Sequence, residues 1–125
     1  MNKNTNLHSR RIETLVKNLN KIQTDRGTCG FRKKLITSDE CSSVAISHLD
    51  ISDAKKHYHK KTTEFYYVLS GTGEIELNDE KIPIKTGTIV MINPGVVHRA
   101  IPHENLKVLV IMTPPTGETE DQFYV

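Results

Sequence analysis

Apolar and polar residues alternate along most of the chain after Gly27. In segment 43–50, Val44, Ile46 and His48 fall on one face of an extended strand, and the residues between them fall on the other. Turn residues such as glycine, proline, asparagine and aspartate interrupt this alternation about every 8–12 residues. The pattern predicts strands at residues 31–37, 43–50, 55–59, 64–69, 73–77, 81–85, 88–92, 96–101 and 106–112.

Many short strands joined by tight turns favour an all-β sandwich, barrel or jelly roll over a layout that alternates strands with helices. The S-G-T-G run at 70–73 predicts a hairpin between two of the strands. Pro83 places the strand at 81–85 at an edge or at a strand end, because proline cannot donate a ladder hydrogen bond.

The segment before Gly27 has a helical period instead. Ser9 is a suitable N-cap, and T-D-R-G ends the pattern at Gly27. The apolar positions that recur at helical spacing are Ile12, Leu15, Val16, Leu19 and Ile22. We therefore predict a short N-terminal amphipathic helix. One domain would then comprise a tail and helix at 1–27, a barrel at 28–113 and a C-terminal tail at 114–125. The final F-Y-V could pin this tail across a barrel mouth or against a partner.

Composition narrows the function classes. The chain has 125 residues, 36% of them hydrophobic, and a formal charge of +2, which is too weak to indicate nucleic acid or a membrane surface as partner. Two cysteines are too few for a disulfide framework. There is no apolar run of about 18 residues and no secretory signal. We expect a soluble cytoplasmic protein that acts on small molecules.

Candidate metal-binding side chains cluster in residues 57–71, H-Y-H-K-K-T-T-E-F-Y-Y-V-L-S-G. His57 and His59 are two residues apart, so on a strand both imidazoles point to the same face. A reversal over Lys60–Thr63 would bring Glu64 back beside them. Two neutral imidazoles and a carboxylate suit one divalent iron, manganese, nickel, cobalt or zinc ion.

A further histidine stands on a well-defined corner. His98 closes a G-x-x-H turn that begins at Gly95, and Pro94 stiffens the approach to it. His48 is a weaker candidate to line the same pocket, and a surface position fits it better.

Together these spacings resemble the cupin superfamily. H-x-H-x4-E-x6-G at 57–71 is similar to the first cupin motif, and G-x7-G-x-x-H at 87–98 is similar to the second. The resemblance, closest to small single-domain bacterial cupins, implies an antiparallel double-stranded β-helix, the jelly-roll barrel. It also implies a metal ion held inside that barrel by His57, His59, Glu64 and His98, with no organic cofactor.

The resemblance leaves the reaction open. We expect an enzyme acting on a small polar metabolite, with dioxygenase and sugar isomerase or epimerase chemistry as the nearest types. The alternatives are a non-catalytic metal-dependent binding or sensor module, and a metal that serves only to close the barrel. Tyr66 shares the parity of Glu64, so its phenol is the candidate catalytic proton donor, although a tyrosine packed in the core fits the same pattern.

The sequence also contains a basic run and several apolar residues expected at the surface. The run Arg32-Lys33-Lys34 reads as a charged strand edge, and nothing in its pattern supports a phosphate site. The helix stripe, the outward Tyr58, Phe65 and Tyr67, and the F-Y-V tail offer more apolar area than one small barrel covers. We therefore expect a homodimer.

Overall fold

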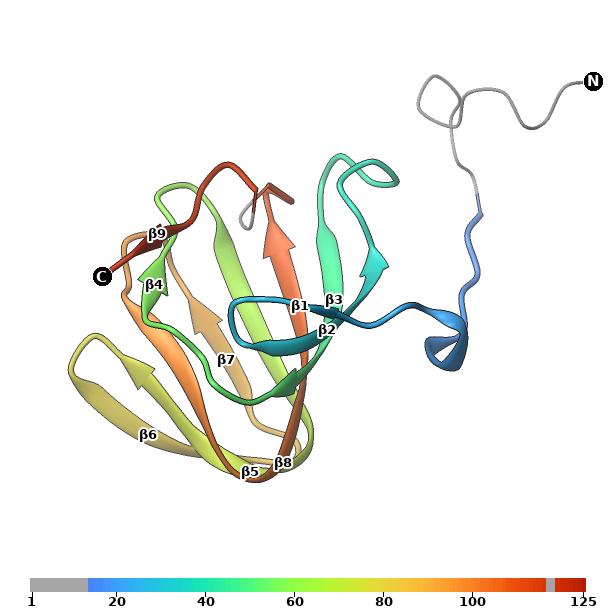
Figure 1. Ribbon diagram of the computed structural model, residues 1–125. Coiled ribbons are helices and arrows are strands. Elements are labelled where there is room, and N and C mark those ends of the chain that lie inside the picture. Colours follow the sequence, from blue (N-terminus) through green and yellow to red (C-terminus); the bar gives the residue numbers. More distant parts are fainter. Residues whose placement is uncertain (1–13, 117–118) are drawn as a thin grey trace, which may run out of the picture.

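The chain forms a curled antiparallel sheet of nine strands in the computed structural model, which describes residues 14–116 and 119–125 (Figure 1). The strands are β1 (Asp25–Arg26), β2 (Gly30–Ile36), β3 (Ala45–Ile51), β4 (His57–Tyr58), β5 (Thr63–Leu77), β6 (Glu80–Lys85), β7 (Ile89–Ile92), β8 (His98–Thr113) and β9 (Phe123–Tyr124). The prediction of an all-β chain with many short connections is confirmed.

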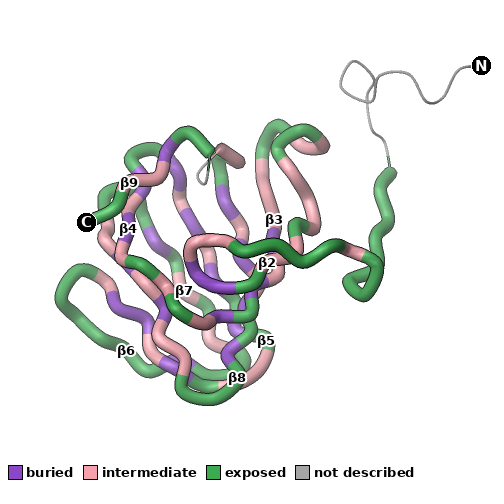
Figure 2. Tube along the Cα trace, in the orientation of Figure 1, coloured by how far each residue is buried: buried purple, intermediate pink, exposed green. Residues whose placement is uncertain are grey.

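The long strands β5 and β8 are the central pair of the sheet. They run antiparallel from Thr63 opposite Thr113 to Leu77 opposite His98. Strands β1, β2 and β3 extend the sheet beyond β8, while β6 and β7 pair with β5. The sheet curls so that buried positions alternate along β3, β5 and β8 and face a common interior (Figure 2). That interior core includes Leu49, Tyr66, Val68, Ile75, Leu106, Val108 and Val110.

The predicted hairpin at residues 70–73 is wrong, because the chain bends there without reversing. Gly71 has a φ of +85°, and Asn105, across from it on β8, has a φ of +40°. A Cβ atom at Gly71 would lie 2.2 Å from the carbonyl oxygen of Glu104 and 2.3 Å from that of Asn105. Glycine thus lets the two backbones approach while both strands bend, with register shifts on either side. The bend converts four predicted strands into two long ones.

The predicted N-terminal amphipathic helix is also not borne out. The part before residue 14 lies outside the described residues, and the rest contains only one 3-10 turn, Leu19–Lys21. Val16 is 80% exposed, whereas Ile22 is half-buried and Leu19 borders a depression beside Phe31, so the apolar stripe is covered only in part. A short helix with so little packing is marginal in water, which explains the loss. Among the described residues, no helix has the length and apolar character to cross a membrane.

Pro83 lies where the sequence placed it. It is in β6, which pairs with β5 alone among the described strands. An edge strand tolerates proline, because the N–H that proline lacks is not needed on the unpaired side.

Candidate metal centre

Four potential metal-binding side chains meet inside the barrel. His57 lies on β4 and is paired in register with His98, the first residue of β8. His59 follows β4 directly, and Glu64 lies near the start of β5. One donor atom from each of the four lies within 4.8 Å of the others, and every one of these side chains is buried. The sequence prediction that these residues converge agrees with this geometry.

All three imidazoles are held in the same orientation by backbone carbonyl groups. Nδ1 of His57 lies 2.8 Å from the oxygen of Lys55, Nδ1 of His98 lies 2.9 Å from that of Val96, and Nδ1 of His59 lies 2.7 Å from that of Asp121. A carbonyl oxygen only accepts, so each Nδ1 carries the proton and donates it. A neutral ring held in this way has the lone pair of Nε2 free for a metal, the arrangement found behind metal-binding histidines. Without a metal, Nε2 of His59 lies 3.2 Å from Glu64 Oε1 and donates a hydrogen bond to it.

His98 Nε2 is buried and has no hydrogen-bond partner among the described residues. Glu64 Oε1 lies 2.8 Å away, but because Nδ1 of His98 carries the proton, a neutral His98 has no proton on Nε2 to donate to this carboxylate. A buried nitrogen without a partner is unfavourable. A divalent metal would accept this lone pair, and the donor set of three imidazoles and one carboxylate fits iron, manganese, cobalt, nickel or zinc.

The electrostatics of the metal-free site follow from crowding these groups. Burial and the neighbouring His98 lower the pKa of His57 to about 4. Burial alone would raise the pKa of Glu64, but His59 and His98 outweigh it and lower that pKa to about 2. Burial likewise opposes the charged form of His59, yet Glu64 and then Asp121 raise its pKa above the ordinary value. Glu64 is therefore a carboxylate, ready to bind a cation at neutral pH.

Asp121 is a site residue that sequence reasoning missed. Its carboxylate accepts three backbone N–H bonds, from Lys60 at 2.8 Å, Lys61 at 2.8 Å and Thr62 at 2.9 Å. These amides form the turn between His59 and Glu64. The carbonyl of Asp121 also holds His59, so one tail residue positions two metal-binding side chains. Nothing in the local pattern around Asp121 marks this role, because it depends on a contact about 60 residues away.

Strand β9 pairs with β4 and lies beside the metal centre on that side. Tyr124 pairs with His57 and Phe123 with Tyr58. Gln122 Nε2 donates to Thr28 Oγ1 at 2.7 Å and to the Tyr124 hydroxyl at 3.0 Å, which links the tail to the loop after β1. The small cavity here, lined in part by Thr28, His57 and Glu64, measures about 10 Å³, the size of a single water. The expected role of the tail as a cover agrees with this arrangement.

Tyr66 points inward beside the centre. Its ring lies edge-on to that of His98, with centroids 6.3 Å apart, and its hydroxyl lies 3.8 Å from Cys29 Sγ. Burial, with the nearby Cys29 and Glu64, raises the pKa of Tyr66 well above its usual value. Burial also raises the pKa of Cys29 to about 12. Both groups therefore keep their protons at neutral pH.

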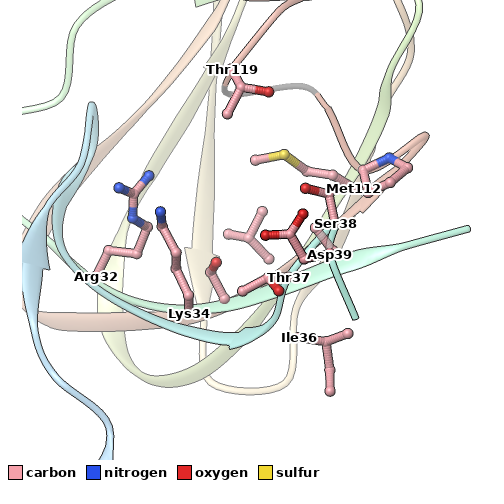
Figure 3. Close-up of a pocket in the computed structure, with 12 residues that line it drawn as sticks. Arg32, Lys34, Ile36, Thr37, Ser38, Asp39, Met112 and Thr119 are labelled. Carbon is pink, nitrogen blue, oxygen red and sulfur yellow. The ribbon is translucent and has the colours of Figure 1, made fainter. Parts of the chain in front are cut away.

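A larger cavity of about 340 Å³ opens on the β2–β3 side of the barrel interior (Figure 3). Met112 borders both this cavity and the small one beside Glu64. Arg32 and Lys34 line the large cavity, whereas Lys33 does not. The exposed Lys34 agrees with the prediction that this run is mostly a charged strand edge, although Arg32 and Lys34 also border the cavity.

His48 lies on the other face of the sheet from the metal centre. It borders a shallow depression with Phe31, Lys33 and Lys107, whereas Ser47 and Leu49 on either side of it are buried in the interior. The weaker suggestion that His48 lines the metal pocket is thus incorrect, because β3 turns its odd-numbered residues inward.

Comparison with known proteins identifies a family. Residues 51–112 match the family described as Cupin domain. The uncharacterized protein MJ1618 of Methanocaldococcus jannaschii is 36% identical over 68 residues, which are 53% of this chain and 54% of that protein. The matched part of the chain thus spans about half the length of this relative.

Two further similarities extend over most of the chain. L-ectoine synthase of Desulfatibacillum aliphaticivorans is 27% identical over 103 residues, covering 80% of this chain and 79% of that enzyme. A crystal structure of a protein from Planctomyces limnophilus superposes with a TM-score of 0.82 at 26% identity, covering 92% of this chain and 100% of the other. The barrel is therefore a fold that this chain shares with known proteins.

Proposed function

This chain belongs to the cupin superfamily, and from that premise we propose that it is a small metal-dependent enzyme acting on a small polar metabolite. The observation that carries the proposal is the set of three imidazoles, each oriented by a backbone carbonyl at Nδ1, whose side chains converge with an ionised Glu64. A bound divalent ion would supply Lewis acidity, or O₂ activation if the ion were iron.

The residues of the chain would do the rest. His57, His59, Glu64 and His98 would hold the ion. Tyr66, which keeps its proton, would donate a hydrogen bond or a proton to a substrate oxygen. The apolar barrel wall would exclude water and strengthen these polar contacts.

Proton-transfer chemistry of the isomerase or epimerase type is the form of this proposal that Tyr66 favours, because a protonated phenol is a ready acid. The dioxygenase type is the second form, and the histidine-rich donor set with a carboxylate favours it. Substrate-dependent O₂ consumption by the iron-loaded protein would distinguish the second from the first. The similarity to L-ectoine synthase supports an enzymatic role without naming this reaction.

A non-catalytic role is the alternative, and the small size of the cavity beside Glu64 favours it. A metal bound by four protein side chains beside so small a cavity would be structural, or would serve a binding or sensor module. Failure to convert any member of a broad metabolite panel, together with tight binding of one of them, would favour this class. A cytoplasmic homodimer remains a prediction.

Metal analysis tests the centre itself. We expect about one transition-metal ion per chain as purified, and its loss in His98→Ala, because this change removes one of four donors. His103→Ala is the matched control, since His103 is exposed and contacts only Glu74 among the described residues. An unchanged metal content in His98→Ala would contradict the ligand assignment.

A further inference from the structure

The large cavity in the barrel interior carries two cationic side chains from one strand. Arg32 and Lys34 are two residues apart on β2, so both point to the inner face, and Figure 3 shows them reaching into the cavity. Lys33 points to the outer face, where its Nζ donates to the carbonyl of Leu19 at 2.9 Å. Arg32 is half-buried and Lys34 is exposed at the open side of the cavity, so the ammonium group of Lys34 is accessible to an anion that enters it.

The two cations are presented differently. Asp25 accepts hydrogen bonds from Arg32 Nε at 2.9 Å and Nη2 at 3.1 Å, which fixes the guanidinium at the cavity wall. No ion pair is recorded for Lys34 within residues 14–116 and 119–125. The remaining charged residue of the lining is Asp39, and the polar ones are Thr37, Ser38, Ser47 and Thr119. Hydroxyl groups beside a lysine and an oriented arginine are suited to a carboxylate or a phosphate.

Strand register connects this cavity to the metal centre. Reading across the inner face of the sheet, Lys34 is opposite Ser47, Ser47 is opposite Val110, and Val110 is opposite Tyr66. The next row runs from Ala45 through Met112 to Glu64. Neighbouring strands are about 4.8 Å apart, so Lys34 and Tyr66 are separated by roughly 14 Å along the curved sheet and by less across the interior. A single small molecule can span that distance.

We propose that Arg32 and Lys34 bind the anionic group, a carboxylate or a phosphate, of the metabolite whose other polar end reaches the metal centre. This inference rests on the proposed function and adds a substrate class to it, namely small anions. Lys34 is then a specificity-determining residue, whereas Lys33, its neighbour on the outer face, is not.

Binding of simple anions to the metal-loaded protein tests the proposal. The probes are succinate, glutarate and inorganic phosphate at constant ionic strength, with neutral succinamide as the uncharged counterpart of succinate. Backbone amide shifts of Arg32, Lys34 and Ser47 in NMR titrations report where each probe binds. We expect at least one anion to shift these amides, and Lys34→Gln to weaken its binding about tenfold, the effect of losing one charge-assisted hydrogen bond.

The control is Lys33→Gln, which removes the same charge from the opposite face and should leave anion affinity unchanged. Comparison of phosphate with the two dicarboxylates identifies which anionic group the cavity prefers. Equal weakening by Lys33→Gln and Lys34→Gln, equal shifts with succinamide, or no shifts at these amides would each overturn the proposal.

Metal analysis of the same samples separates the two hypotheses. Lys34→Gln should keep its metal, because Lys34 is not a donor. If the unmodified protein binds an anion at Lys34 but holds no metal, the anion site stands while the proposed enzyme falls. If it holds the metal but binds no anion, the substrate class falls while the metal centre stands.

Discussion

Asp121 joins the C-terminal tail to the metal centre through two different atoms. Its carboxylate binds the turn at residues 60–62, and its carbonyl binds His59. Burial opposes the charged form of Asp121, but the three backbone N–H groups outweigh it and lower the pKa of the carboxyl. The donor groups of the metal centre are therefore positioned by residues that never touch a metal.

We expect Asp121→Ala to lower the free energy of unfolding by about 3 kcal/mol, because it leaves several backbone N–H groups without an acceptor. Urea denaturation of the mutant and the unmodified protein measures the difference. Glu120→Ala is the control, since Glu120 is exposed, and it should be close to neutral. Equal stability of the two variants would contradict the anchoring role.

His57 makes the metal-free protein sensitive to mild acid. Its pKa is about 4 in the folded chain against an ordinary 6.5, so the unfolded chain binds more protons between these values. The contribution of His57 to the free energy of unfolding is therefore fully present above pH 6.5 and is lost as the pH falls toward 4. The pKa of Glu64 is lowered to about 2 from 4.5, so the stability that Glu64 contributes is lost mostly below pH 4.5. The pKa of His59 is raised above 6.5, so the stability that His59 contributes is lost as the pH rises above 6.5.

Denaturation of chelator-treated protein at several pH values across this window measures the effect. His57→Gln removes the titrating group and should flatten the dependence, while His103→Gln should leave it unchanged. A slope that survives in His57→Gln would assign the effect to another group.

At the level of elements, the bend shared by β5 and β8 closes the barrel. It brings the start of β8, with His98, back over β4, and it depends on the close approach at Gly71. Gly87 has a similar φ of +90° but has no atom within 4 Å of a Cβ built on it. These two glycines therefore separate the effect of a crowded contact from that of backbone conformation alone.

We expect Gly87→Ala to lower the free energy of unfolding by about 1 kcal/mol, the conformational penalty alone. Gly71→Ala should lower it by several times that amount or prevent folding, because the added methyl overlaps two carbonyl oxygens. Thermal and urea denaturation compare the two variants. Similar losses in both would show that β5 and β8 can separate at the bend.

At the level of the whole molecule, the outer face of the barrel retains an apolar strip. Ile89 is 61% exposed and Met91 57% exposed, and across from them on β5 lie Tyr67 and Phe65. Tyr58, by contrast, stacks on Phe123, with ring centroids 5.5 Å apart, so the tail covers it. The strip on β5 and β7 is the surface on which we expect the predicted homodimer to form.

Light scattering at micromolar concentration should find a dimer, and Met91→Glu should shift it to monomer by placing a charge in the contact. Val16→Glu, at an exposed apolar residue outside the barrel, is the control and should remain dimeric. An unmodified protein that is monomeric under these conditions would remove the prediction.

The sequence by itself determined the strand-rich fold and the four candidate donors. Strand alternation puts His57 and His59 on one face. The turn that begins at Gly95 identifies His98 as a candidate, and the start of a strand identifies Glu64. These are short-range properties, since the period of a strand and the preferences of glycine need no knowledge of the rest of the chain.

Only the tertiary structure decided the features that depend on partners far along the chain. Which face of β2 and β3 turns inward follows from the pairing of β3 with β8. This pairing puts Arg32 and Lys34 on the face that borders the cavity and His48 on the opposite face. Asp121 gained its role from a turn some 60 residues earlier, and the bend at Gly71 from Asn105. The helical stripe before Gly27 is covered only in part, and a short helix needs a packed face to form. Local pattern sets what a segment can do, whereas burial against a distant segment sets what it does.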